Sequence, residues 1–363
     1  MQMDKEMTET GLLRLRGVVK RFGTFTALKG VDLDIREGEF FTIVGPSGSG
    51  KSTLIRLLVG MDELTEGTIW LRDRRIDQTP ANQRPTCMVF QSLALFPHMS
   101  VGQNIEFPLK LRKVDPAARR ARALELLDLL RLPRDYYDKR IAQCSGGEKQ
   151  RVALARALAF DPEILFFDEP LSALDYRLRK TLEKELKDLH ARTGRTFVYI
   201  THSLEEAMVM SDRIAIMREG RFEQIATADE IYSAPVSRFV AEFMGEVNLF
   251  DAEISAEGQL AARGLECRAG LRPDGMAPEA RGMLMVRPEY LRFTDDPARF
   301  DFTLRGSLEG EYELGSRIQY KISTAEGGTI TVEKLREDRL QAPPDGKVTV
   351  GFDLSHTHLI PEA

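Results

Sequence analysis

Apolar residues in the first two-thirds of the chain fall into short runs. The clearest runs lie at 40–44, 164–167 and 196–200, and each consists almost entirely of large apolar residues. A run of this kind, without alternation, is typical of a strand buried inside a parallel sheet. Segments with helical periodicity lie between the runs. This order of elements predicts an α/β fold in which helices cover a largely parallel sheet.

Three of the predicted helices have recognisable boundaries. The helix that follows the run at 40–44 carries leucines on one face and ends at Gly60. A second begins with Asp115 as its cap and Pro116 in its first position. A third follows Asp175, has leucines at helical spacing and ends near Gly194. We assign these leucine stripes to the core and expect no other role for them.

The pattern changes near residue 240 and is that of a β domain from Leu249 onward. Ile318, Tyr320 and Ile322 alternate with polar residues, and the segment 325–328 turns the chain into a further apolar run at 329–332. Two more strands are predicted at 283–286 and 348–352. We therefore expect one domain over 1–243 and a small all-β domain over 244–363.

Composition and charge narrow the possible classes of protein. The chain has 363 residues, 42% apolar and 29% charged, which is ordinary for a soluble protein of two or three domains. Its net charge of −5 disfavours a nucleic-acid partner. No apolar run approaches the ~18 residues that span a bilayer, and the polar segment 1–10 does not resemble a signal peptide. Three widely spaced cysteines, Cys87, Cys144 and Cys267, favour a reducing cytosol.

The segment from Gly45 to Ser52 reads GPSGSGKS and lies between a predicted strand and a predicted helix. In this context the pattern predicts a phosphate-binding loop, because glycines let backbone N–H groups surround phosphates while Lys51 supplies positive charge. The Ser52 hydroxyl can bind Mg²⁺. A chance glycine-rich turn is disfavoured by the flanking elements. The expected phosphate-binding residues are Gly45, Ser47, Gly48, Gly50, Lys51, Ser52 and Thr53.

Polar residues follow the apolar runs at 88–90, 164–167 and 196–200. Asp168 and Glu169 end one of them, and a pair of acids there is costly unless a cation or a reaction uses it. Asp168 suits Mg²⁺ bound through water, and Glu169 suits a base that polarises attacking water. The carboxyl ends of parallel strands share one edge of a sheet, so His202 is expected near the γ-phosphate. Gln91 suits Mg²⁺ or water, although by itself it suits a structural role equally well.

Two further features remain ambiguous when taken alone. Ser145, Gly146 and Gly147 open a predicted helix, whose first N–H groups and partial positive charge make a second anion site. Phe22 has a π-face on which adenine can stack, but a lone phenylalanine more often belongs to the core.

Taken together, these motifs resemble the ATP-binding-cassette (ABC) ATPases. The family's motifs occur in order over about two-thirds of the chain: Phe22, GPSGSGKS, Gln91, the signature CSGGEKQR, FFDEP, Ser172-Ala173-Leu174-Asp175 and His202. The resemblance implies a P-loop nucleotide-binding domain over 1–243, with a helical subdomain at about 92–157. It also implies that Phe22 stacks on adenine. Two copies would sandwich two ATP molecules head to tail, so that Ser145, Gly146 and Gly147 contact the ATP of the partner copy.

Other segments resemble one subgroup of the family. The stretch 89–101 is similar to that of binding-protein-dependent importers, and 244–363 resembles their OB-like, TOBE-type regulatory domain. The stretches 174–180 and 243–250 are most similar to the spermidine/putrescine type, although sugar, sulfate and ferric-iron importers share most of the motifs. The resemblance implies ATP and Mg²⁺ as cofactors. It also implies two transmembrane permease subunits, a periplasmic or extracellular binding protein that acts indirectly, no nucleic acid, and a peripheral location on the cytoplasmic face of the plasma membrane.

The sequence departs from the family pattern at a few positions. Cys144 replaces the common Leu, Glu148 and Lys149 stand where Gln is common, and Ser203 replaces the usual Asp. Cys144 suits either a small buried hydrophobe, which we favour, or a thiolate stabilised by a helix N-terminus.

Rival functions are a soluble cassette in DNA repair or translation, an exporter ATPase, and a regulator that does not hydrolyse ATP. The chain lacks the insertions or fused membrane helices of the first two, and Glu169 and His202 argue against the third.

Overall fold

The computed structural model describes residues 11–172, 174–272, 278–341, 343 and 345–362. Contacts within the chain divide it into two units, one up to Ala228 and one from Asp229 onward. The polar segment 1–10 and Ala173 lie outside the described residues. No helix in the described ranges is long and apolar enough to cross a membrane.

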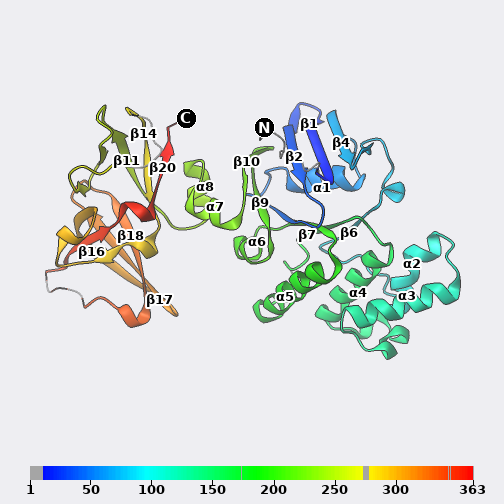
Figure 1. Ribbon diagram of the computed structural model, residues 1–363. Coiled ribbons are helices and arrows are strands. Elements are labelled where there is room, and N and C mark those ends of the chain that lie inside the picture. The colour runs from blue at the N-terminus through cyan, green and yellow to red at the C-terminus, as the bar shows by residue number, and fades with distance from the viewer. Residues whose placement is uncertain (1–10, 173, 273–277, 342, 344, 363) are drawn as a thin grey trace, which may run out of the picture. The chain divides into compact units, whose positions relative to one another are not determined.

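The first unit is built on a six-stranded sheet with the strand order β10-β9-β3-β8-β7-β6. Its strands pair in parallel from β9 to β6, and only β10 runs antiparallel to its neighbour. The three strands predicted from apolar runs are therefore confirmed as neighbours in a largely parallel sheet, of which Figure 1 labels β6, β7, β9 and β10. The strands are β3 (Phe40–Val44), β6 (Thr86–Val89), β7 (Ile164–Asp168), β8 (Thr196–Ile200), β9 (Arg213–Arg218) and β10 (Arg221–Ala226).

Side chains that alternate along these strands fill two separate cores. Phe167 and Tyr199 pack on one face, against the helices α2 to α5. Phe166 and Val198 pack on the other, against α1 and a second sheet. Burial on both faces explains why these strands show apolar runs rather than alternation. The helices of the unit are α1 (Lys51–Val59), α2 (Val101–Leu111), α3 (Pro116–Leu129), α4 (Gly146–Ala159), α5 (Tyr176–Thr193) and α6 (Leu204–Met210).

The predicted helix boundaries are confirmed by their caps. The Asp115 carboxylate accepts the N–H groups of the first turn of α3, and the Asp175 carboxylate does the same for α5. Gly60 and Gly194 end α1 and α5 in the left-handed conformation, with φ values of 82° and 60°.

The second sheet of this unit is antiparallel and is not among the elements predicted from the sequence. Its strand order is β2-β1-β4-β5, and it covers part of α1. The register of β1 shifts after Leu15, at Val18 and after Lys20, so its apolar residues do not keep a period of two. The strands are β1 (Leu13–Phe22), β2 (Phe25–Ile35), β4 (Glu66–Leu71) and β5 (Arg74–Arg75).

The second unit is all-β apart from short helices, with two antiparallel sheets that share one core. Ile318, Tyr320 and Ile322 are fully buried in that core, as their alternation predicts, and the curled antiparallel sheet is consistent with the expected OB-like fold. One sheet contains β11 (Asn248–Ile254), β12 (Leu260–Ala262), β14 (Arg281–Val286) and β20 (Thr357–Pro361). The other contains β13 (Glu266–Cys267), β15 (Arg292–Phe293), β16 (Phe302–Leu314), β17 (Arg317–Thr324), β18 (Thr329–Leu335) and β19 (Lys347–Phe352).

Two short helices, α7 (Ala228–Ser233) and α8 (Arg238–Phe243), precede these sheets. The guanidinium of Arg287 is almost completely buried and donates to the carbonyls of Tyr232 at 3.0 Å and Ala241 at 2.9 Å. Contacts of this kind join α8, and α7 after its first residue, to the β unit from Asp229 onward. The boundary predicted at 243/244 instead places the helices with the first domain.

Arg287 allows a test of where the second unit begins. A fragment that starts at 229 keeps the carbonyls of Tyr232 and Ala241, whereas one that starts at 244 loses both and leaves a buried cation short of acceptors. Each unsatisfied buried group costs about 1–3 kcal/mol, so we expect the shorter fragment to be several kcal/mol less stable in urea titrations. Arg287→Leu should harm the longer fragment more than the shorter one. Equal midpoints for the two fragments would contradict this account and support a boundary at 243/244.

Candidate active site

The topology of the central sheet brings the predicted site residues to one edge. Strands β3, β8, β7 and β6 are parallel neighbours, so their carboxyl ends lie side by side. The loop from Gly45 follows β3, and Gln91 follows β6 by two residues. Glu169 follows β7, and His202 follows β8 by two residues. Ligand sites of open α/β sheets occur at such an edge.

Two glycines of the loop have no room for a side chain. A Cβ atom at Gly45 would lie 2.1 Å from the carbonyl oxygen of Met217. A Cβ at Gly50, whose φ is 109°, would lie 2.9 Å from the carbonyl oxygen of Ala27. Ser47, Gly48 and Ser52 are exposed, and Thr53 is half-buried. The loop is therefore held tightly on its inner side and is open on its outer side.

The ammonium group of Lys51 is buried and folded back onto its own loop. Its Nζ donates to the carbonyls of Gly45 at 2.7 Å and Pro46 at 3.0 Å. Burial lowers the pKa of Lys51, while the charges of Glu169 and Asp168 act in the opposite direction. A cation whose hydrogen-bond acceptors are neutral carbonyls gains a stronger partner when a phosphate arrives.

Asp168 and Glu169 lie close enough to influence each other. Burial, and then the charge of Glu169, raise the pKa of Asp168, and Lys51 opposes them. A carboxylate oxygen of Glu169 is 3.3 Å from Nδ1 of His202. Three of the predicted residues therefore meet in one cluster beside Lys51.

The backbone of Glu169 is strained. Its φ of 45° lies in the left-handed region, where residues other than glycine are uncommon. Its N–H donates to the carbonyl of Ile200 at 2.9 Å, which ties the end of β7 to β8. This bond helps to fix the direction in which the Glu169 side chain points from the end of β7. Strain of this kind clusters at functional sites.

Gln91 reaches the same cluster through Ser172. The amide Nε2 of Gln91 donates to Oγ of Ser172 at 3.1 Å, and that hydroxyl donates to the carbonyl of Glu169 at 2.8 Å. From the sequence, Ser172 is only the first residue of the Ser172-Ala173-Leu174-Asp175 motif, and no role is predicted for it. Its position three residues after Glu169 was the available signal, because a hydroxyl there can close a turn onto the preceding carbonyl.

The signature turn, Ser145-Gly146-Gly147, caps the N-terminus of α4. The Ser145 hydroxyl accepts the N–H of Glu148 at 3.3 Å, and the Glu148 carboxylate accepts the N–H of Ser145 at 2.7 Å. That backbone bond, with added bonds from Tyr136 and Lys139, lowers the pKa of Glu148 to about 2. The spacing of Ser145 and Glu148 predicts such a capping box, which the sequence analysis overlooked.

The two glycines of the signature turn lie against the start of α5. A Cβ at Gly146 would lie 3.7 Å from Leu174, and one at Gly147 would lie 3.2 Å from Leu178. The last turn of α4 holds a different segment, because the Arg156 guanidinium donates to the carbonyls of Leu93 at 2.8 Å and Ala94 at 2.7 Å. One helix therefore joins the signature turn to the segment that follows Gln91.

The departures from the family pattern at Cys144 and Ser203 have structural explanations. Cys144 is 6% exposed, packs in the helical core and places Sγ 3.7 Å from the carbonyl of Arg140. Burial raises the pKa of its thiol, which supports the packing role and argues against a stabilised thiolate. Ser203 caps α6 by accepting the N–H of Glu206.

Phe22 lies at the end of β1 and is 49% exposed. The ammonium of Lys20 lies 4.8 Å from the centre of its ring. The ring is therefore outside the two cores of the unit and offers a surface on which a planar group can stack.

The residues present fit a magnesium ion. No cluster of three or more His, Cys, Asp or Glu side chains that could hold a metal occurs within the described ranges. Mg²⁺ does not require such a cluster, since it usually binds one or two carboxylates, substrate phosphates and water. The carboxylate of Asp168, whose pKa is raised by burial and by Glu169, is the kind of group that a cation would stabilise.

Comparisons with known proteins agree with this geometry. The ABC transporter family model matches residues 28–172, and the TOBE domain model matches 284–360. The chain is similar to a solved dimer of the ATP-binding cassette MJ0796 bound to ADP and Pi, with 34% identity and a TM-score of 0.53. That match covers 60% of this chain and 98% of the other.

Curated relatives match over most of the chain. Spermidine/putrescine import ATP-binding protein PotA 1 of Pseudomonas aeruginosa is 44% identical over 335 residues, 89% of this chain and 90% of the relative. PotA of Roseobacter denitrificans is 50% identical over 285 residues, 77% of each chain. The chain therefore belongs to the ABC transporter family, as an ATP-binding subunit that hydrolyses ATP.

Proposed function

We propose that this chain hydrolyses ATP at the strand-end site of its first unit and thereby drives the import of polyamines. The observation that carries the proposal is the cluster of Lys51, Glu169 and His202 beside a loop in which two glycines have no room for a side chain. The names of the relatives, which are spermidine/putrescine import proteins, support the class of substrate.

In this proposal the loop after β3 holds the β- and γ-phosphates of ATP. The ammonium of Lys51 exchanges its carbonyl acceptors for phosphate oxygens, and the exposed side of the loop offers its N–H groups. Phe22 stacks on the adenine ring. Mg²⁺, bound by Ser52, Gln91 and, through water, Asp168, would neutralise phosphate charge when present. The residues assigned to phosphate binding are Gly45, Ser47, Gly48, Gly50, Lys51, Ser52 and Thr53.

Glu169 acts as the general base in the hydrolysis step. Its carboxylate accepts a proton from a water molecule whose oxygen forms a bond to the γ-phosphorus, while the bond from that phosphorus to the leaving oxygen of ADP breaks. His202, which lies 3.3 Å from the carboxylate, orients it and contacts the γ-phosphate. Gln91, which follows the neighbouring strand β6, contacts the same water.

The complete site requires a second copy of the chain. Ser145, Gly146 and Gly147 open a fourteen-residue helix, α4, whose N-terminal end attracts anions. We assign them to the γ-phosphate of ATP held by the partner copy in a head-to-tail dimer. The solved relative bound to ADP and Pi is dimeric, which supports this assembly.

The remaining partners follow from the class of transporter. Two transmembrane permease subunits would form the path for the polyamine, and a periplasmic or extracellular binding protein would deliver it. The ATPase would lie peripherally on the cytoplasmic face of the plasma membrane. The import function named for the relatives supports these assignments.

Replacing the proposed base provides the first test of this function. We expect Glu169→Gln to bind ATP normally but to hydrolyse it ~10²–10⁴-fold more slowly, because glutamine cannot accept the proton. Steady-state ATPase assays and nucleotide titrations measure the two effects. Glu125→Gln, at an exposed position on α3, is the matched control and should leave turnover unchanged. Turnover of the Glu169 variant within a few-fold of the parent would exclude Glu169 as the base.

The same variant tests the class of substrate in cells. If the chain drives polyamine import, Glu169→Gln should abolish uptake of radiolabelled spermidine or putrescine that depends on this gene. Uptake of sugar, sulfate or ferric iron should not change. Loss of one of those activities, with polyamine uptake intact, would refute the substrate assignment without affecting the ATPase assignment.

Lys51 tests the phosphate-binding role of the loop. Lys51→Ala removes charge-assisted hydrogen bonds to phosphate that exist before the reaction starts, so we expect ATP to bind about tenfold to a hundredfold more weakly. Calorimetric titration measures the affinity, and circular dichroism checks that the variant folds. Lys184→Ala, on the exposed face of α5, should bind ATP normally. An unchanged ATP affinity in Lys51→Ala would show that the loop does not hold phosphate through this residue.

A further inference from the structure

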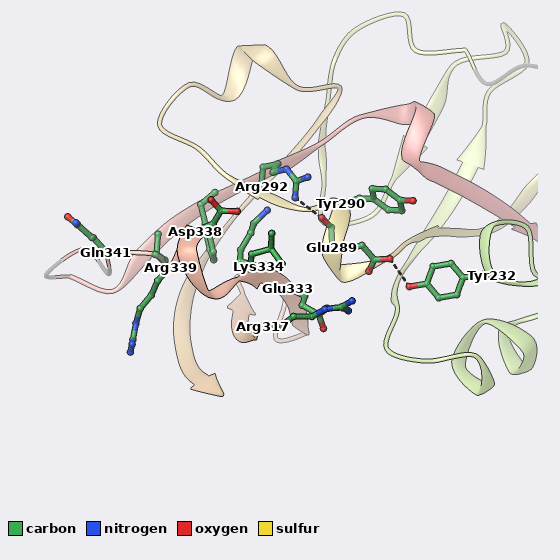
Figure 2. Close-up of a pocket in the computed structure, with 13 residues that line it drawn as sticks. Tyr232, Glu289, Tyr290, Arg292, Arg317, Glu333, Lys334, Asp338, Arg339 and Gln341 are labelled. Atoms are coloured by element: carbon green, nitrogen blue, oxygen red, sulfur yellow. Dashed lines mark hydrogen bonds and ion pairs between the residues drawn. The ribbon is translucent and has the colours of Figure 1, made fainter. Parts of the chain in front are cut away.

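The second unit contains a pocket of about 900 Å³ that the ATPase site does not use. Figure 2 shows the side chains that line it, from the segment around Tyr290, from β15 and from β18 and the turn after it. Ligand pockets typically have volumes of about 300–1,000 Å³, so the space suits a small molecule. Its apolar lining includes Phe293, Leu335 and Leu340.

Several of the charged side chains that line the pocket already have partners of their own. The Glu289 carboxylate accepts the hydroxyl of Tyr232 at 2.6 Å (Figure 2). Glu333 forms an ion pair with Arg317 at 2.7 Å. Arg339 forms ion pairs at 2.5 and 3.1 Å with two glutamates of β16. Arg317 and Arg339 are therefore compensated by their glutamate partners, whereas Glu289 keeps its negative charge because a tyrosine hydroxyl is neutral.

Arg292 and Lys334 differ, because their hydrogen-bond acceptors are neutral. Arg292 donates to the carbonyl of Glu289 at 2.6 Å, and the half-buried Lys334 donates to the carbonyl of Leu291. No carboxylate in the described ranges forms an ion pair with either cation. The exposed Asp338 is the acid whose charge favours the protonated form of Lys334. Arg292 and Lys334 are thus two neighbouring cations of the pocket lining whose side chains donate to carbonyl groups only.

We propose that this pocket binds a small organic anion, with its phosphate or carboxylate group between Arg292 and Lys334 and its body against Phe293, Leu335 and Leu340. A guanidinium and an ammonium provide the donors that such a group requires. A cationic ligand would be repelled by the same two residues. A purely apolar ligand would cover the half-buried ammonium without offering it an acceptor, which is unfavourable.

The protonation of Lys334 provides an independent signal of binding. Burial, with the nearby charge of Arg292, lowers the pKa of Lys334 to about 8 in the free protein. A bound anion favours the charged form and raises that pKa again. Binding near pH 8 should therefore be accompanied by proton uptake, which diminishes well below pH 8, where Lys334 is already protonated.

The test uses the full chain without nucleotide, and the Lys51→Ala variant of the same chain identifies any part of the binding that occurs at the P-loop. Phenyl phosphate and benzoate are titrated calorimetrically, with phenol as the uncharged counterpart. We expect saturable binding of at least one of the two anions and weaker binding of phenol. Arg292→Met and Lys334→Met should each weaken anion binding about tenfold or more. Arg299→Met, an exposed position of the same unit outside the pocket lining, should have no effect.

Titrations at pH 8 in two buffers of different ionisation enthalpy measure the proton uptake, which should disappear in Lys334→Met. The proposal is overturned if neither anion binds, if phenol binds as well as the anions, or if the two methionine variants bind like the parent. Because no step of the test requires hydrolysis, its result is independent of the proposed ATPase and transport functions.

Discussion

Strands β3, β8, β7 and β6 run in the same direction, and this shared direction determines where the chemistry occurs. Each strand delivers its following loop to the same edge of the sheet, so groups from four distant parts of the sequence come together. The arrangement requires close backbone packing, because Gly45 lies against the carbonyl of Met217 and Gly50 lies against that of Ala27. Larger residues at these two positions would push the phosphate loop away from the neighbouring strand ends.

Much of this site could be predicted from the sequence because the loop and the strand-end residues that form it each have a local sequence pattern. The phosphate loop has its glycines, and Asp168 and Glu169 stand out as charges at the end of an apolar strand. The contacts between the pieces have no such signature. The bridge from Gln91 through Ser172 to Glu169 depends on how two loops meet, and Lys51 folding onto its own carbonyls depends on the local path of the loop.

The fold shows the same limit. Strands buried on both faces were predictable, but the antiparallel sheet was missed because register shifts in β1 interrupt the alternation that identifies a one-sided strand. The grouping of α7 and α8 with the second unit rests on contacts such as those of the buried Arg287, whose acceptors lie 46 and 55 positions earlier in the sequence. In contrast, Glu148 and Ser203, which depart from the family pattern, serve as local helix caps, a role that their side chains fill well.

The left-handed backbone conformation of Glu169 lowers the free energy of unfolding of the first unit. Glycine adopts a φ near 45° freely, whereas a residue with a Cβ pays strain there of about 1–3 kcal/mol. A glycine at 169 would relax the turn but remove the carboxylate next to His202. Folding stability alone would therefore favour glycine at this position, and the role proposed for the carboxylate accounts for the glutamate found there. An acidic residue that adopts a backbone conformation suited to glycine at a strand-end turn therefore indicates that its side chain is needed there for more than folding stability.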